Sequence, residues 1–266
     1  MSELSRNNQR REIAVGSPNG LVARWSRGAW LAKAPIIVVG TALPRRQTGG
    51  TKRVTLLISV WDFIRDNQDR FNDLLFSHLR LSATALLAAI VLYVPLGVAF
   101  SRMNKVGSPA VGALSSLRVA PSLALVFVFV PWLGFGYRPA LLALVLLAAP
   151  PIVLNTFAGM RSVDAAAIEA AQGLGMNPIQ VFTQVQFPLA LPVLLAGIRS
   201  ASVEIVASAT LASLIGVKTL GQYIFTGISL LDTTYLLAGG LPIVMLVLMI
   251  ESVFGGIERL VSPASR

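Results

Sequence analysis

The chain has 266 residues, of which 55% are hydrophobic and only 13% are charged. Soluble domains carry about 25% charged residues, so much of this protein's surface must face lipid, and an ordinary soluble enzyme is excluded. Cysteine is absent and His78 is the single histidine, which excludes a disulfide framework and a multi-histidine metal site. We therefore expect no metal site and no catalytic residues.

The net charge of +10 is concentrated at the N-terminus. Residues 1–53 hold ten Lys and Arg against Glu3 and Glu12, a net of +8, and the remaining chain has a net of only +2. The basic charge therefore does not indicate a nucleic-acid partner. We expect residues 1–53 to be a disordered basic extension, or, if the native protein starts at Val54, not to be translated at all.

Uncharged stretches of 18 to 22 residues recur along the chain, and about 20 apolar residues cross a bilayer as a helix. A fifth stretch, Leu189–Ile215, contains Arg199 and Glu204, which must face the bundle interior or a wet cavity. The sequence thus predicts an all-α integral membrane protein with five core transmembrane helices. The four uncharged stretches are Leu81–Ser101, Val119–Tyr137, Pro139–Met160 and Thr233–Ile250.

The remaining segments are assigned from their length and from the bias of Lys and Arg in short loops. Residues 54–80 are expected to form an extracytoplasmic segment before the first helix, residues 81–260 the transmembrane domain, and residues 261–266 a cytoplasmic tail. Arg102 follows the first span and Arg161 the third, so these loops are expected inside. We expect a multi-pass protein of the cytoplasmic (inner) membrane with a cytoplasmic C-terminus.

The loop at residues 161–188 separates the third and fourth spans and reads RSVDAAAIEAAQGLGMNPIQVFTQVQFP. A loop of this length is usually functional. Asp164 is a plausible N-cap for a helix over 165–171, Gly175 follows that helix, and a second short helix is expected over Asn177–Gln186. Two short helices joined by a glycine bend would form a knob that suits docking on a soluble partner.

This loop resembles the permease subunits of ATP-binding-cassette importers, whose pattern is E-A-A-x3-G-x9-I-x-L-P. Glu169-Ala170-Ala171 is followed after three residues by Gly175 and after nine more by Val185-Gln186-Phe187-Pro188. The resemblance implies a type I importer permease fold in which this loop couples to an ATPase; the alternative is that its small residues only satisfy packing. The implied coupling residues are Asp164, Glu169, Ala170, Ala171, Gly175 and Pro188.

Residues 61–260 look like the osmoprotectant branch of that family, whose members carry glycine betaine, choline, carnitine or proline. The alternatives are the same machine for an amino acid, taurine or another solute, a membrane-embedded enzyme, and an uncoupled channel. Gly216–Gly221 reads G-V-K-T-L-G where the family often has G-A-G-G-L-G. The resembling stretches are Pro95-Leu96-Gly97, Ala120-Pro121-Ser122-Leu123-Ala124, Gly134-Phe135-Gly136, Asn155-Thr156 and Ala209-Thr210-Leu211-Ala212.

The resemblance also implies partners: a second permease, identical or related, two ATPase subunits, an extracytoplasmic binding protein and membrane lipid, with no nucleic acid. This chain lacks an ATP site, because Lys218-Thr219 is preceded by Val217 rather than by the glycine of a phosphate-binding loop. We expect no cofactor in this chain, with ATP and Mg used by the partner ATPase.

Polar residues in the spans are the candidates for a translocation path: Asn155, Arg199 and Glu204. Asn155 could instead tie helices together, and Arg199 could reach an interface; the five-residue spacing of Arg199 and Glu204 is poor for a direct pair. His78 is expected to be interfacial without a special role. An aromatic cluster could form a cage for a quaternary ammonium or a membrane-interface belt; its members are Trp132, Phe135 and Tyr137.

Overall fold

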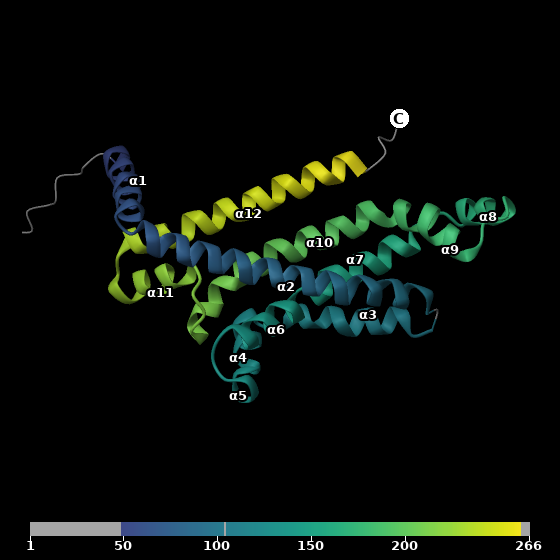
Figure 1. Cartoon of the computed structure of the whole chain (residues 1–266), viewed down its shortest axis with the longest axis horizontal. Coiled ribbons are helices and arrows are strands. Elements are labelled where there is room, and N and C mark those ends of the chain that lie inside the picture. Colours follow the sequence, from purple (N-terminus) through teal and green to yellow (C-terminus); the bar gives the residue numbers. More distant parts are fainter. Residues whose placement is uncertain (1–48, 104, 262–266) are drawn as a thin grey trace, which may run out of the picture. The chain divides into compact units, whose positions relative to one another are not determined.

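A computed structural model describes residues 49–103 and 105–261, and within these ranges the secondary structure is entirely helical (Figure 1). Residues 1–48 of the expected basic extension and most of the expected tail lie outside the described residues, and residues 49–53 begin the first helix. The helices are α1 (Gly49–Asp66), α2 (Gln68–Arg102), α3 (Gly107–Ser115), η1 (Ser116–Val119), α4 (Ser122–Val128), α5 (Val130–Leu133), α6 (Tyr137–Leu147), α7 (Ala149–Arg161), α8 (Ala165–Gly173), α9 (Pro178–Gln180), η2 (Val181–Gln186), α10 (Phe187–Ala209), η3 (Thr210–Ile215), α11 (Gly221–Leu230) and α12 (Thr233–Val261).

Four helical stretches among the described residues are long and apolar enough to cross a membrane, and a fifth crossing is added if one bent pair counts as a span. The four belong to α2, to α6 with α7, to the continuous run from α9 to η3, and to α12. In the bent pair, Gly107–Val119 and Ser122–Leu133 meet at 98°. The expectation of an all-α protein with several membrane spans is confirmed.

The predicted span Val119–Tyr137 is not one helix. The chain leaves the helical region at Ala120, where ψ is 128°, and resumes as the short helices α4 and α5. Pro121 explains this break, because proline lacks an N–H donor and disfavours helical backbone at the residue before it. The bent pair that occupies this region also includes α3 and η1, which begin before the predicted span.

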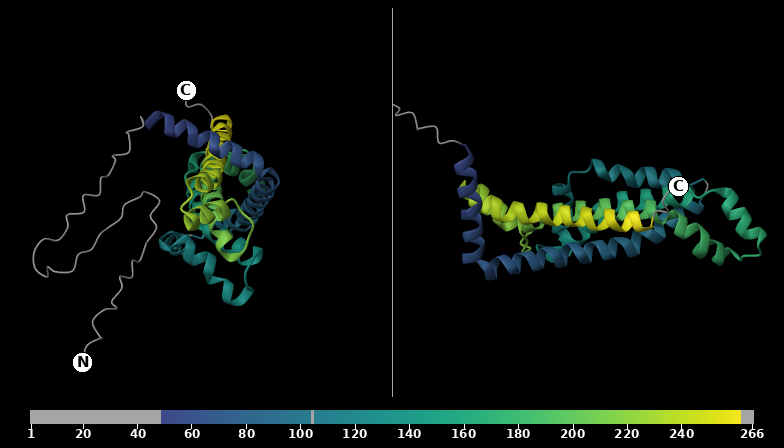
Figure 2. Two further views of the ribbon diagram at one scale, coloured as in Figure 1. Left: turned by 90° about the vertical axis from the view of Figure 1, so that its left-hand side faces the viewer. Right: turned by 90° about the horizontal axis from the view of Figure 1, so that it is seen from above.

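The segment 54–80, expected to precede the first helix, is itself helical. It comprises most of α1 and the first thirteen residues of α2. Helix α1 is held by tertiary packing: the Phe63 ring lies 4.6 Å from the Tyr235 ring and 5.6 Å from the Tyr223 ring, centroid to centroid. Figure 2 shows α1 running across the ends of α2 and α12. A search for membrane-length apolar runs overlooks this segment because it is amphipathic.

His78 is not an interfacial residue. It is fully buried on α2, and its Nε2 lies 3.1 Å from the carbonyl oxygen of Val206 on α10. Leu74, one turn earlier, is also buried and packs in the same cluster as Val206. His78 therefore joins α2 to α10.

The core between α2, α6, α7 and α10 contains many small residues. Helices in membranes approach closely where side chains are small, because packing must supply the attraction that water supplies elsewhere. A Cβ on Gly97 of α2 would lie 2.6 Å from the Cβ of Thr156 on α7. A Cβ on Gly197 of α10 would lie 2.6 Å from the Cβ of Asn155 on α7. Alanines complete this core: Ala85, Ala89, Ala140, Ala143, Ala148, Ala149, Ala201 and Ala209.

Candidate functional site

The loop between α7 and α10 forms two short helical pieces with defined starts. The Asp164 carboxylate accepts a hydrogen bond from the Ala166 N–H at 2.9 Å, so Asp164 is the N-cap of α8 as predicted. Asn177 and Gln180 form a capping box at α9, with side chain to backbone distances of 2.9 and 2.8 Å. The second helix runs through η2, a π-helix, into α10. Figure 1 shows α8 and α9 extending beyond the end of the long helices.

Gly175 makes the bend between these pieces. Its φ is +82°, a conformation that glycine adopts without steric cost. The Met176 N–H donates to the Ala171 carbonyl at 3.2 Å and the Gly175 N–H to the Gln172 carbonyl at 2.9 Å. This pair of bonds is a Schellman motif, which ends α8 and turns the chain back toward α9.

The tip of the loop presents two large apolar side chains that the sequence analysis did not single out. Leu174 is 83% exposed and Ile179 is 74% exposed, one on each side of the glycine bend. Glu169 and Ala170 are also exposed, whereas Ala171 is buried against the rest of the loop. Exposed apolar side chains can mark an interaction site, so this tip is the candidate docking surface.

The base of the loop is attached to two spans. The Arg102 guanidinium at the end of α2 lies 4.8 Å from the centroid of the Phe182 ring in η2. The Gln186 amide donates to the Met160 carbonyl of α7 at 3.3 Å. Pro188, the last residue of the predicted pattern, is exposed in the first turn of α10. A displacement of the loop would thus act on α2, α7 and α10 together.

The three candidate path residues do not converge on one site. The Asn155 amide donates to the Pro151 carbonyl at 2.8 Å, and Asn155 packs at the close α7–α10 contact with Gly197. This geometry matches the alternative in which Asn155 ties helices together. Glu204 is half-buried on α10, and the structure gives it no hydrogen bond or ion pair with another described residue.

Arg199 turns toward α12 rather than toward Glu204. It forms ion pairs with Glu251 and with Glu258, the second at 2.9 Å. Gly255 lies between the two carboxylates, and a Cβ there would be 3.8 Å from the Arg199 guanidinium. The cluster thus links the middle of α10 to the C-terminal half of α12.

The comparison with known proteins decides the family. Residues 93–266 match the family described as the binding-protein-dependent transport system inner membrane component. The choline transport system permease protein OpuBB of Bacillus subtilis (strain 168) is 38% identical over 189 residues, covering 71% of this chain and 87% of the relative. The chain belongs to this permease family. The carnitine transport permease protein OpuCB of Listeria monocytogenes is 37% identical over 201 residues, covering 76% of this chain and 92% of the relative.

Solved structures support the fold of this permease. A chain of the inward-facing MetNI methionine ABC transporter superposes with a TM-score of 0.62 and 21% identity, covering 71% of this chain and 94% of that one. A chain of an amino acid ABC transporter with histidines gives a TM-score of 0.54 and 18% identity, covering 74% of this chain and 94% of that one. The permease has the type I ABC importer fold and is a multi-pass membrane protein. It is not an enzyme; it works with ATPase subunits, which hydrolyse the ATP, and with a substrate-binding protein.

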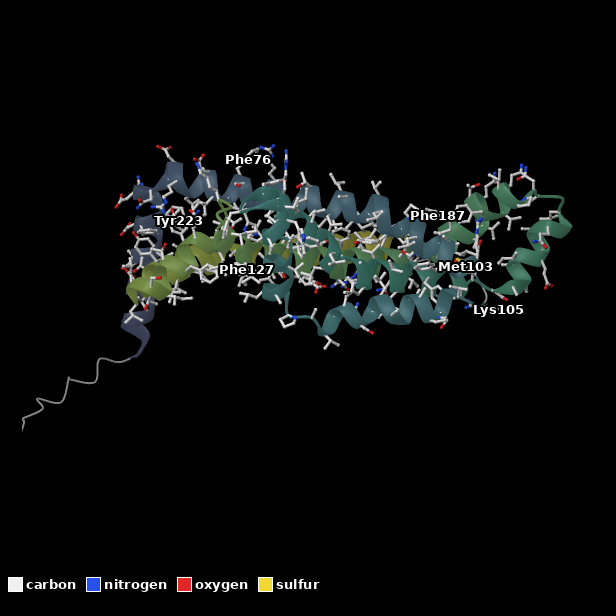
Figure 3. The ribbon with its side chains drawn as sticks, turned by 90° about the horizontal axis from the view of Figure 1, so that it is seen from below. Phe76, Met103, Lys105, Phe127, Phe187 and Tyr223 are labelled. Carbon is white, nitrogen blue, oxygen red and sulfur yellow. The ribbon has the colours of Figure 1, made fainter. Side chains whose placement is uncertain are left out.

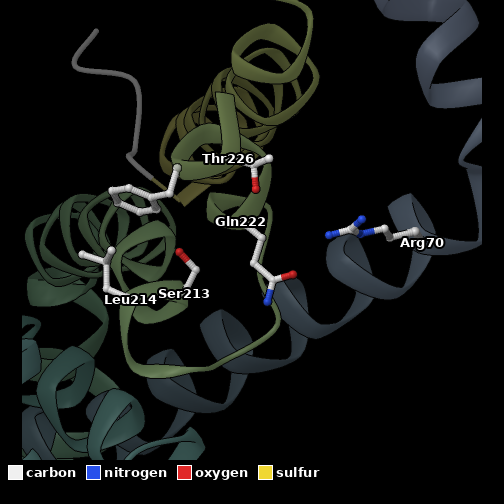
Figure 4. Close-up of a pocket in the computed structure, with 6 residues that line it drawn as sticks. Arg70, Ser213, Leu214, Gln222 and Thr226 are labelled. Carbon is white, nitrogen blue, oxygen red and sulfur yellow. The ribbon is translucent and has the colours of Figure 1, made fainter. Parts of the chain in front are cut away.

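The end of the permease opposite the loop carries an open polar cavity of about 340 Å³ (Figure 4). Figure 3 shows Tyr223 at this end and Met103 and Lys105 at the other. The three aromatic residues weighed as a cage or as a membrane-interface belt do not close around a common space: Trp132 and Phe135 are exposed, whereas the Tyr137 hydroxyl bonds to Thr84 at 2.5 Å. The cavity is lined by Arg70, Ser213, Leu214, Gln222, Phe225 and Thr226.

Replacing Arg199 with alanine should lower the thermal unfolding midpoint of the detergent-solubilised permease by a few degrees. The change leaves Glu251 and Glu258 close together without their shared cation. Arg259→Ala, at an exposed position of the same helix end, is the control and should leave the midpoint unchanged. Equal midpoints for the two variants would show that the cluster does not stabilise the α10–α12 contact.

Proposed function

We propose that this permease is the membrane subunit of an ATP-driven importer that carries osmoprotectants such as glycine betaine, choline and carnitine. The observation that carries the proposal is the set of relatives at 37–38% identity, named as transport permeases for choline, for carnitine, and for glycine betaine, carnitine and choline. The amino acid transporters among the solved structures share only the fold, at 21% identity or less. The osmoprotectant cargo is therefore favoured over an amino acid.

In this proposal two ATPase subunits dock on the loop tips of two permeases, identical or related. Leu174 and Ile179 enter an apolar cleft of the ATPase, and Glu169 supplies a polar anchor at its edge. Positive charges flank the same end of the bundle, at Arg102 and Arg161, which supports a cytoplasmic position for the loop and for the C-terminus. ATP and Mg are used by the ATPases, and this chain binds no cofactor.

The coupling cycle follows from the attachments at the base of the loop. ATP-driven approach of the ATPases draws the two loops together. The Arg102–Phe182 and Gln186–Met160 contacts pass this movement to α2 and α7 and open the path outward. Hydrolysis lets the loops separate again. A binding protein delivers the substrate at the opposite end of the bundle.

The cargo is tested by uptake into vesicles that contain the complex of permease, ATPase and binding protein. Labelled glycine betaine, choline, carnitine and proline are offered beside unrelated amino acids and taurine. The proposal expects ATP-dependent accumulation of one or more quaternary amines and none of taurine. Accumulation of an unrelated amino acid alone would contradict the osmoprotectant assignment and retain the importer.

A further inference from the structure

The open cavity at the end of the bundle opposite the loop takes no part in the coupling described above. Helix α2 contributes Arg70 to its lining, and η3 and α11 contribute the other lining residues. Its volume of about 340 Å³ lies at the lower end of the range of small-molecule sites. In the proposed function this end of the bundle faces outward, so the cavity lies on the side where the binding protein delivers the substrate.

Arg70 is the one charged side chain among the described residues that line the cavity. The centre of its guanidinium lies 5.7 Å from the centroid of the ring of Tyr223, which is buried on α11. Arg70 has no ion pair with a described residue, although Asp69 and Asp73 are close to it along the chain. The aromatic ring attracts the guanidinium and leaves its N–H groups free to donate hydrogen bonds. The cavity therefore contains a positioned cation that can still pair with an anion.

Gln222 and Thr226 provide further donors beside Arg70. They lie four residues apart on α11, and therefore on one face of that helix, and their side chains form no hydrogen bond with a described residue. Figure 4 shows the Arg70 guanidinium and the Gln222 amide pointing into the same space. The Ser213 hydroxyl, by contrast, already donates to the Thr210 carbonyl at 2.9 Å. None of the described lining residues is acidic, so this set of donors suits a carboxylate.

The rest of the lining is apolar and consists of Leu214 and Phe225. An aromatic ring is a favourable neighbour for a quaternary ammonium. A zwitterion such as glycine betaine or carnitine carries a carboxylate and a methylated ammonium on one small skeleton. The cavity offers a surface to each of these two ends, whereas choline has only the ammonium end.

We propose that this cavity is an entry site for zwitterionic substrates, in which Arg70, Gln222 and Thr226 bind the substrate carboxylate. This inference rests on the proposed function and adds to it a place where the substrate first binds the permease. The site receives the substrate from the binding protein before the substrate enters the bundle. Because the cavity is open to solvent, its ion pair with the substrate is weak, and the substrate can move on.

The chain contains no cysteine, which allows a direct test of binding in the cavity. Leu214→Cys places a single thiol in the lining, and its rate of labelling by a maleimide is measured in the purified permease–ATPase complex without binding protein. Glycine betaine at four times its dissociation constant should slow the labelling about fivefold, and choline at the same concentration should not. Adding Arg70→Gln should abolish the protection. Leu230→Cys, at a 62% exposed position outside the lining, is the control and should react at one rate with and without substrate.

Uptake by the reconstituted importer tests the role of the Arg70 charge in transport. With saturating binding protein, Arg70→Gln should lower the initial rate of glycine betaine uptake about fivefold, as expected for the loss of an ion pair at a solvent-open site, and leave choline uptake unchanged. Lys218→Gln is the matched control, because Lys218 is an exposed cation in the turn before α11 and does not line the cavity. It should leave both rates unchanged.

The entry site is overturned if the importer carries glycine betaine but this substrate does not protect Leu214→Cys, or if choline protects it equally well. It is also overturned if only the binding protein slows the labelling, because the cavity is then a docking surface for that protein. The proposed function stands in each of these cases. Transport of choline without any zwitterion would likewise overturn the site alone. Transport of no quaternary amine would overturn the proposed function together with the site.

Discussion

Replacing Gly175 with alanine should weaken the binding of the ATPase to the permease about tenfold. Gly175 has a φ of +82°, and an L-residue in that conformation costs about 1–2 kcal/mol. The added Cβ would meet no atom within 4 Å, so the effect comes from the backbone and not from a clash. Relaxation of the bend would move Leu174 and Ile179 apart. The measurement is the dissociation constant of the purified ATPase for the permease in detergent or nanodiscs.

Gly173 provides the matched control two residues away. It is also open to solvent, with no atom within 4 Å of an added Cβ, but its backbone is helical. Gly173→Ala should leave ATPase binding unchanged, because alanine favours the helix that glycine weakens. Equal losses for the two variants would show that the backbone conformation at Gly175 is not what positions the docking surface.

Replacing Gly197 with valine should strongly reduce the amount of folded permease in the membrane. The Cβ alone would lie 2.6 Å from the Asn155 Cβ and 2.8 Å from the Pro151 carbonyl oxygen, so α7 and α10 must separate. Overpacking of this kind costs about 1–3 kcal/mol or more. The measurement is the yield of monodisperse protein after solubilisation together with its thermal unfolding midpoint.

Gly256 on α12 is the control for this second prediction, because no atom lies within 4 Å of an added Cβ there. Gly256→Ala should give a normal yield and midpoint. A normal yield for Gly197→Val would mean that α7 and α10 do not make the close contact described here.

The sequence predicted the features that depend on local signals. Length and hydropathy were sufficient for α2, for α6 with α7, for α10 and for α12. Cap and turn chemistry was sufficient for the loop, where Asp164 caps α8 and Gly175 makes the bend. These signals act over a few residues, so a single chain displays them.

Features that depend on distant residues were not predictable. Arg199 pairs with glutamates 52 and 59 residues later in the chain, and no spacing rule indicates such partners. Helix α1 packs through Phe63 on Tyr223 and Tyr235, which lie more than 150 residues later in the chain. The exposure of Leu174 and Ile179 follows from how the two loop pieces fold on each other, which the pattern of the loop did not indicate.

The segment Gly216–Gly221 departs from the pattern that the family often has, and the structure explains which of its positions keep glycine. Gly216 has a φ of +85° and ends η3. Gly221 packs against the Thr210 carbonyl without room for a Cβ. The two glycines that match the family pattern are therefore required by backbone geometry, whereas Val217 and Thr219 fill buried positions between them.

The most direct test of the account measures ATP hydrolysis and substrate accumulation in the same vesicles, with the permease, its ATPase and its binding protein. We predict that labelled glycine betaine or choline accumulates above its external concentration only with ATP, and that Gly175→Ala reduces accumulation and hydrolysis together. Equilibration of the substrate without ATP, at the same rate in wild type and variant, would contradict the account and indicate an uncoupled channel.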